Sequence, residues 1–288
     1  MSWANYHTHC SFCDGTEDPE AYILEAISSH VASVGFSSHC PLPVITSWNM
    51  PEERFDEYFD TLGNLKKKYE GKADVNIGLE VDYISGVDVL AGRDISRLGY
   101  TIGSVHFLGR DGLKNNWTVD GSAAEFERGV GLCFGGDMRK AVEAYYMSLQ
   151  EMIIHTDADI IGHFDIIKKN NEHGRYFDEN EAWYASLTDA TLDLVSGYGK
   201  IVEINNGGMS RGIISSMYPS VRIMEKCLDK KIPVVMSSDA HTPGHLIYGF
   251  REMSMLLDAV GFKEVFVLKG GKWGPRGFSP EGIHLNLI

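Results

Sequence analysis

The chain has 288 residues, 43% hydrophobic and 23% charged, which is typical of a globular protein with room for one large α/β domain or two smaller ones. The formal net charge of −14, without a dense block of Lys and Arg, argues against a nucleic-acid-binding surface. No apolar run approaches the ~20 residues of a membrane helix, and no secretory leader precedes the first expected strand. The five scattered cysteines indicate a reducing, cytoplasmic location and no disulfide framework.

Short β-branched runs alternate with longer runs of helical periodicity. We expect strands at residues 3–7, 34–38, 76–81, 100–105, 160–162, 200–205, 234–237 and 264–268. We expect helices at residues 18–33, 51–69, 87–98, 137–155, 179–196, 219–229 and 246–260. Seven or eight parallel strands joined by right-handed crossovers suit a barrel better than an open sheet. No linker divides the chain, so we expect a single domain over residues 1–288.

Residues 114–136 lack a clear period. We expect them to form an irregular excursion near the fourth strand that could serve as a lid. The glycine-rich run at residues 129–136 does not match G-x-G-x-x-G and follows no expected strand, so it does not predict a dinucleotide site.

The stretch His7-Thr8-His9, with Asp14 close behind, carries the strongest chemical signal. Side-chain direction repeats every two residues in a strand, so both imidazoles face the same side. Two neutral imidazoles and a carboxylate begin a metal site, although a buried, hydrogen-bonded histidine pair would give the same pattern. Cys10 and Cys13 form a C-x-x-C, but no second one follows, so a thiolate site is the weaker interpretation.

Similar residues recur at or just after the other expected strand ends, where the chemistry of parallel barrels gathers. They are His39, Glu80, His106, His163, Asp165, Glu203, Asn205, Asp239 and His241. Six of the 11 histidines lie at such ends, and we expect the remaining five to be structural or surface residues: His30, His155, His173, His245 and His284. One catalytic cation needs only three or four protein ligands, so this many indicates two or three cations.

In this order, the motifs resemble those of the polymerase and histidinol phosphatase (PHP) superfamily. The matching motifs are His7-Thr8-His9 with Asp14-Gly15, Ser38-His39, Gly78-Leu79-Glu80, Gly103-Ser104-Val105-His106, Gly162-His163 and Ser238-Asp239-Ala240-His241. Two further segments resemble its histidinol-phosphatase branch: Met50-Pro51-Glu52-Glu53 and Tyr218-Pro219-Ser220. The resemblance implies a distorted (β/α)7 TIM-like barrel with a trinuclear centre of divalent Zn, Fe or Mn. It also implies hydrolysis of L-histidinol phosphate in histidine biosynthesis.

Carried over by position, the resemblance implies three metal sites. The first would be held by His7, His9, Glu80 and Asp239, the second by Glu80, His106 and His163, and the third by Asp14, His39 and His241. Glu80 would bridge two cations, and Asp239 or His241 would help to protonate the leaving alkoxide. A water activated by the cations would attack phosphorus.

Phosphate also needs fixed donors, commonly Arg, Lys or backbone amides. Related phosphatases carry an arginine where this chain has Ser210, and Arg211 follows it, so the phosphate-binding cation is open. Lys168 and Lys169 are second candidates, and any of these cations could instead be a surface charge. Glu203 and Asp165 could orient imidazoles, face a substrate amine, or be satisfied carboxylates at strand ends.

Two kinds of function remain in competition. The favoured one is a phosphatase for a small phosphorylated metabolite, with L-histidinol phosphate ahead of a nucleotide or sugar phosphate. The other is a metal-bearing barrel that only binds a partner, which has no need of so many polar groups at one rim. No sequence feature specifies the oligomeric state.

Overall fold

The computed structural model describes residues 1–44, 46–109 and 117–285. Its main sheet has seven parallel strands in the order β1-β2-β3-β4-β7-β8-β9. These strands are β1 (Trp3–Asn5), β2 (Val31–Phe36), β3 (Asp74–Asp82), β4 (Tyr100–Ser104), β7 (Ile160–Ile161), β8 (Ile201–Asn205) and β9 (Val234–Ser237). A parallel bridge between Thr8 and Ala240 joins the chain after β1 to the chain after β9, so the sheet is a nearly closed barrel. The predicted distorted (β/α)7 barrel is confirmed.

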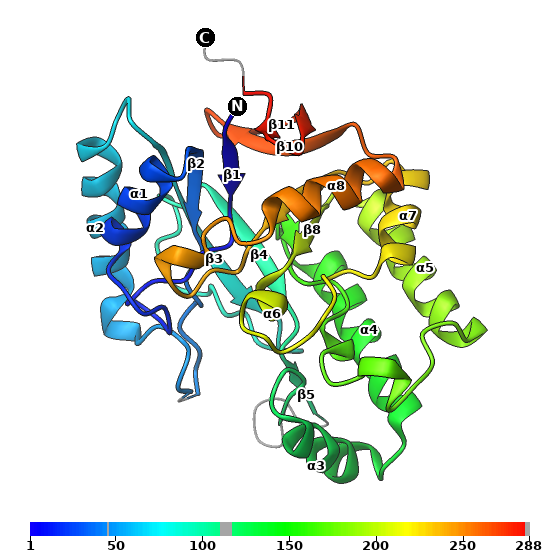
Figure 1. Cartoon of the computed structure of the whole chain (residues 1–288). Coiled ribbons are helices and arrows are strands. Elements are labelled where there is room, and N and C mark those ends of the chain that lie inside the picture. Colours follow the sequence, from blue (N-terminus) through cyan, green and yellow to red (C-terminus); the bar gives the residue numbers. More distant parts are fainter. Residues whose placement is uncertain (45, 110–116, 286–288) are drawn as a thin grey trace.

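Helices surround this barrel (Figure 1). They are α1 (Pro19–Ser28), α2 (Phe55–Lys68), α4 (Met138–His155), α5 (Ala182–Gly197), α7 (Val221–Asp229) and α8 (Phe250–Val260). In α2, acidic residues lie in the first turn and three lysines in the last, which suits the helix dipole. The same helix buries Phe55, Tyr58, Phe59 and Leu62, the one-face spacing of an amphipathic helix. Short helical turns lie between the strands and helices: η1 (Glu52–Arg54), η3 (Ile166–Lys168), η4 (Glu172–Gly174), α6 (Gly207–Ser210) and η5 (Pro243–His245).

The helix predicted over residues 87–98 is wrong. Residues 83–99, all within the described part of the chain, form turns and an isolated bridge instead. Gly86 and Gly92 both adopt φ of 77°, in the left-handed region. The carboxylates of Asp88 and Asp94 each accept a hydrogen bond from the backbone N–H two residues on, and such local bonds compete with a helix.

The irregular excursion predicted over residues 114–136 is also wrong for its second half. Residues 114–116 lie outside the described residues, β6 (Trp117–Thr118) pairs with β5 (Phe107–Leu108), and α3 (Ala123–Phe134) follows with a capping box between Ser122 and Glu125. In the sequence, Gly129 and Gly131 interrupt the helical spacing of apolar residues in α3. At Gly129 an added Cβ would lie 2.1 Å from the Trp117 ring, so this glycine is needed for packing.

The strand predicted at residues 264–268 exists as β10 (Glu264–Lys269), but it does not extend the barrel. It pairs with β11 (Lys272–Ser279), which pairs with β12 (Gly282–Ile283), in a separate antiparallel sheet. Its Leu268 N–H donates to the Tyr6 hydroxyl over 2.8 Å, which ties this sheet to the chain after β1.

The Tyr100 side chain packs against glycines of β2 and β3. A Cβ on Gly35 or Gly78 would lie 2.3 Å from its side chain, and its hydroxyl donates to the Tyr6 carbonyl over 2.6 Å. This packed core supports the functional residues at the strand ends. None of the described helices is both long and apolar enough to cross a membrane.

Candidate metal centre

The centre begins just after β1, at His7 and His9. Both side chains are fully buried, and their ring centroids lie 5.0 Å apart. Asp239, just after β9, reaches both: its Oδ1 lies 3.2 Å from His9 Nε2 and 3.5 Å from His7 Nε2. The three side chains form a group that could surround one cation.

Glu80, buried in β3, lies between two sets of imidazoles. Its Oε2 is 3.2 Å from His7 Nε2 and 3.1 Å from His39 Nδ1, whereas its Oε1 is 3.1 Å from His163 Nε2. The Nε2 atoms of His163 and His106 are only 3.1 Å apart. A cation between two such nitrogens satisfies both lone pairs, and a carboxylate that faces both sets suits a bridging ligand.

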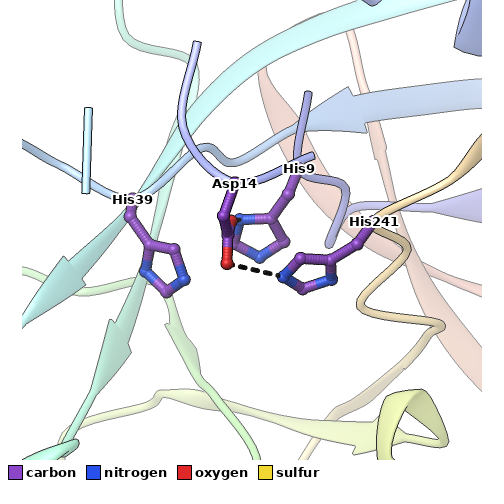
Figure 2. Close-up of side chains that lie close together, drawn as sticks. All are labelled: His9, Asp14, His39 and His241. Carbon is purple, nitrogen blue, oxygen red and sulfur yellow. Dashed lines mark ion pairs between the residues drawn. The ribbon is translucent and has the colours of Figure 1, made fainter. Parts of the chain in front are cut away.

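A third group consists of His9, Asp14, His39 and His241, which point toward one another in Figure 2. The Oδ2 of Asp14 lies 3.3 Å from His241 Nε2, and the His9 ring is 4.3 Å from that of His241 and 4.4 Å from that of His39. Gly15 allows the turn that brings Asp14 here, because an added Cβ would lie 2.3 Å from the His9 carbonyl oxygen.

Asp239 adopts a backbone conformation that non-glycine residues avoid. Its φ is 49°, in the left-handed region, which costs about 1–2 kcal/mol for such a residue. Gly207 makes room for it, since a Cβ there would lie 2.6 Å from the Asp239 Cβ. Strained residues of this kind persist where their surroundings fix them, and they gather at functional sites.

The donor set fits divalent cations. His9 Nε2 and His39 Nδ1 are buried and make no hydrogen bond of good geometry in the described residues, although carboxylate oxygens lie 3.2 and 3.1 Å away, which is uncommon for buried nitrogens. Burial, together with the charges of His241 and His39, lowers the pKa of His9 to about 3, so this imidazole stays neutral and keeps a lone pair for a cation. Neither Cys10, Cys13 nor any of the five histidines expected elsewhere joins these groups in the described chain.

Two carboxylates orient the candidate ligands from behind. Glu203 contacts His7 Nδ1 at 2.5 Å and accepts the His163 N–H at 2.8 Å, in line with one of the roles expected for it. Asp82 lies 2.7 Å from His106 Nδ1 and was missed, although its position two residues after Glu80 on β3 puts it on the same face. Burial opposes a charge on His106, but Asp82 and Glu80 outweigh it and raise the pKa to about 10.

A cavity of about 390 Å³ opens onto this centre. Seven of the nine predicted metal ligands line it: Asp14, His39, Glu80, His106, His163, Asp239 and His241. His7 and His9 lie behind them. The rest of the wall includes Trp48, Asp120, Glu125, Lys169, Arg211 and Tyr218. The cavity wall therefore combines a dense set of possible metal ligands with further basic and acidic side chains.

Of the two residues predicted at the phosphate after β8, the structure places one at this cavity. Arg211 lines the wall, with Nη2 3.0 Å from Asp239 Oδ2 and Nη1 2.9 Å from His241 Nδ1. The neighbouring Ser210 does not line it and donates its hydroxyl to the Gly207 carbonyl over 2.9 Å. Of these two neighbours, only Arg211 therefore brings a cationic side chain to the cavity.

The two lysines predicted as phosphate ligands diverge. Lys169 lines the cavity and donates to the Asp120 carbonyl. Lys168 does not line this cavity: it is 3% exposed, and its Nζ lies 3.0 Å from both Asp165 Oδ2 and the Met217 carbonyl. Asp165 contacts no candidate ligand in the described chain, so of its expected roles the structure favours a strand-end carboxylate paired within the protein.

Comparisons with known proteins agree with this geometry. A family model described as "PHP domain" matches residues 5–207. The chain belongs to the PHP domain family. This PHP chain is 27% identical over 264 residues to the "Probable histidinol-phosphatase" of Deinococcus radiodurans, and the aligned region covers 90% of this chain and 94% of that protein. It is 26% identical over 261 residues to the "Histidinol-phosphatase" of Bacillus subtilis, covering 85% and 95%.

Solved structures share the fold of this PHP domain. The crystal structure of hisK from Listeria monocytogenes has a TM-score of 0.78 at 24% identity, covering 86% of this chain and 99% of that one. The histidinol phosphate phosphatase of Lactococcus lactis, solved with zinc, L-histidinol and phosphate, has a TM-score of 0.64 at 17% identity, and 99% of each chain is covered. At sequence identities of 24% and 17%, these two structures are evidence for the barrel fold of this chain and for nothing beyond the fold.

Proposed function

We propose that this PHP protein is a phosphoric monoester hydrolase that converts L-histidinol phosphate to L-histidinol and phosphate, a step of histidine biosynthesis. The observation that carries the proposal is the convergence of nine imidazole and carboxylate side chains beside a cavity that also holds Arg211 and Lys169. Similarity along most of the chain to proteins named histidinol-phosphatases supports the choice of ester.

We assign three divalent cations, Zn, Fe or Mn, to the groups described above, because imidazoles mixed with carboxylates accept all three metals. His7, His9 and Asp239 would hold the first, His106 and His163 the second, and Asp14, His39 and His241 the third, with Glu80 as the bridge between the first two. When bound, the cations neutralise the phosphate dianion and lower the pKa of a water.

The protein's own side chains have two tasks in this reaction. Arg211, fixed by Asp239, presents a planar guanidinium that orients the phosphate, with Lys169 as a second cation. Burial opposes the charged form of Asp239, but Arg211 and His7 outweigh it and hold its pKa well below the usual range. At neutral pH Asp239 therefore has no proton to give to the leaving alkoxide. We assign both Asp239 and His241 to the reaction as ligands of the cations, because both belong to the groups described above.

The rest of the cavity suits the alcohol part of this substrate. L-Histidinol phosphate carries an ammonium and an imidazole besides its phosphate. Asp120 and Glu125 offer carboxylates on the wall, and Trp48 offers an aromatic ring that stacks with Phe107 at 5.6 Å. A volume of about 390 Å³ is ordinary for a small-metabolite site.

We also propose that residues 1–288 act as one domain in the cytoplasm, with a small phosphorylated metabolite as the partner and no nucleic acid. Cys10, Cys13, Cys40 and Cys227 are free thiols, in line with a reducing compartment.

The test is phosphate release from a panel of monoesters by protein loaded in turn with zinc, manganese or iron. The panel contains L-histidinol phosphate, a sugar phosphate, a nucleoside monophosphate and p-nitrophenyl phosphate. We expect kcat/KM for L-histidinol phosphate to exceed the others by about 100-fold or more, because a site built to pair polar groups rejects ligands that lack them. A higher kcat/KM for another ester would contradict the assignment of L-histidinol phosphate as the substrate. If no ester were hydrolysed, the phosphatase assignment itself would be contradicted.

A further inference from the structure

One tyrosine of the cavity wall has a hydroxyl with nothing to bond. Tyr218 is 3% exposed and lines the cavity, and its Oη is buried without a hydrogen-bond partner in the described residues. By contrast, Tyr58, Tyr100 and Tyr145 all donate to backbone carbonyls, and Tyr22, whose buried hydroxyl also lacks a partner in the described residues, lies outside the cavity. A buried, unpaired hydroxyl costs about 1–3 kcal/mol, so its presence at a ligand cavity points to a ligand atom as the missing partner.

The chain holds Tyr218 firmly in this place. Its backbone exchanges two hydrogen bonds with Asn205 at the end of β8, over 2.8 and 2.6 Å. On one side, Lys168 Nζ binds the Met217 carbonyl over 3.0 Å, and on the other, the Ser220 N–H donates to Asp165 Oδ2 over 2.8 Å. Because Lys168 and Asp165 also pair with each other at 3.0 Å, they form a buried clamp on the segment that carries this ring.

A glycine makes room for the hydroxyl on the cavity wall. A Cβ on Gly208 would lie 3.3 Å from Tyr218 Oη and 2.6 Å from Ile214 Cγ2, which is too close for a larger residue without movement. Gly208 lies on α6, three residues before Arg211, and both Gly208 and Arg211 line the same cavity. The turn after β8 thus brings a guanidinium and a phenol to one wall.

The charges around Tyr218 keep it a proton donor. Burial raises its pKa far above the ordinary value, Asp165 adds to this, and Arg211 opposes it only in part. A neutral phenol so placed donates its proton in a hydrogen bond, and the strongest such bonds are made to anionic oxygens.

We propose that Tyr218 donates a hydrogen bond from Oη to a phosphoryl oxygen of the bound ester, beside Arg211. This inference rests on the proposed phosphatase function and adds a phosphate-binding residue to it. In this arrangement Lys168 and Asp165 are positioning residues that act through Tyr218, which explains why a lysine next to Lys169 in the chain lies away from the cavity.

The test variant is Tyr218→Phe, which keeps the ring and removes only the hydroxyl. In metal-loaded protein we expect inorganic phosphate, measured by isothermal titration calorimetry, to bind about 10-fold more weakly, equivalent to ~1.4 kcal/mol. We expect kcat/KM to fall about 10- to 1000-fold for every ester that is hydrolysed, the range for loss of one oxyanion donor. Tyr22→Phe, in a fully buried tyrosine of α1 outside the cavity, is the matched control and should change neither value.

Metal content and urea unfolding separate this role from a structural one. Removal of an unpaired hydroxyl leaves the stability of the metal-free protein unchanged or raised, whereas loss of a structural bond would lower it. Unchanged phosphate affinity in Tyr218→Phe would overturn the inference, even if turnover of one ester changed. Wild-type protein that binds phosphate but hydrolyses no ester would contradict the proposed function alone, because phosphate binding needs no organic group.

Discussion

Lys168 and Lys169 show how far two neighbouring residues can diverge. Both follow the same strand end and looked equivalent as phosphate ligands, but the 3₁₀ turn of η3 directs one into the protein and the other to the cavity. Sequence spacing does not resolve this, because side-chain direction in a short irregular turn depends on what packs beneath it. The histidines were more predictable, since they follow strands whose ends meet at one rim.

The clamp formed by Lys168 can be tested through stability. Lys168→Met leaves Asp165 as an uncompensated buried charge, so we expect the free energy of unfolding in urea to fall by about 3–5 kcal/mol. Lys140→Met removes the exposed pair with Asp137 and should change it by less than about 1 kcal/mol. Equal effects of the two substitutions would argue against the clamp.

Glu203 provides a second test at the scale of single residues. Glu203→Gln weakens the contact that orients His7, so we expect affinity for the cations to fall about 10- to 100-fold while the protein remains folded. Competition with a chromophoric chelator measures the affinity, and Glu143→Gln on the outside of α4 is the control. Wild-type affinity in Glu203→Gln would show that this carboxylate does not support the site.

At the scale of elements, glycines determined which predictions succeeded. Strands with β-branched runs were found to within a few residues. The helix expected at residues 87–98 failed at Gly86 and Gly92, and α3 was missed because Gly129 and Gly131 interrupt its period. Asp82 was overlooked for a different reason: only the folded barrel shows which strand-end residues stand behind the ligands. Tyr218 was noted in the sequence only as part of a motif, because its place on the cavity wall depends on the fold.

The same substitution should have opposite effects in two elements. In β3, Gly78→Ala would place a Cβ 2.3 Å from the Tyr100 ring, so we expect a loss of about 1–3 kcal/mol from overpacking. In α2, nothing lies within 4 Å of a Cβ at Gly63, so Gly63→Ala should add about 0.5–1 kcal/mol through helix propensity. Urea unfolding compares them directly, and a stabilising Gly78→Ala would contradict the described barrel packing.

At the scale of the whole molecule, cation binding, protonation and folding are coupled. In metal-free protein, burial opposes the charged form of His106 and His7, but neighbouring carboxylates outweigh it. They raise the pKa of His106 from 6.5 to about 10 and that of His7 well above 6.5. A raised folded-state pKa gives stability that is complete below the unfolded value and is lost as pH rises through the folded value. Cations must displace these protons to bind.

We therefore expect the free energy of unfolding of metal-free protein to fall by a few kcal/mol as pH rises from 6.5 to about 10. Metal-loaded protein should show a smaller fall, since cations replace the protons, and its metal affinity should rise over the same range. Urea titrations across pH, with and without chelator, measure both. A metal-free profile that is flat or rises in this window would contradict the assigned charge balance.

The central claim is that imidazoles and carboxylates from separate strands hold several cations at one rim of the barrel. Anomalous X-ray scattering from a crystal of the metal-loaded protein tests it most directly. We predict three peaks, one at each proposed group, with Glu80 between the first two. A single peak, or imidazoles bonded only to one another with no peak among them, would contradict the account.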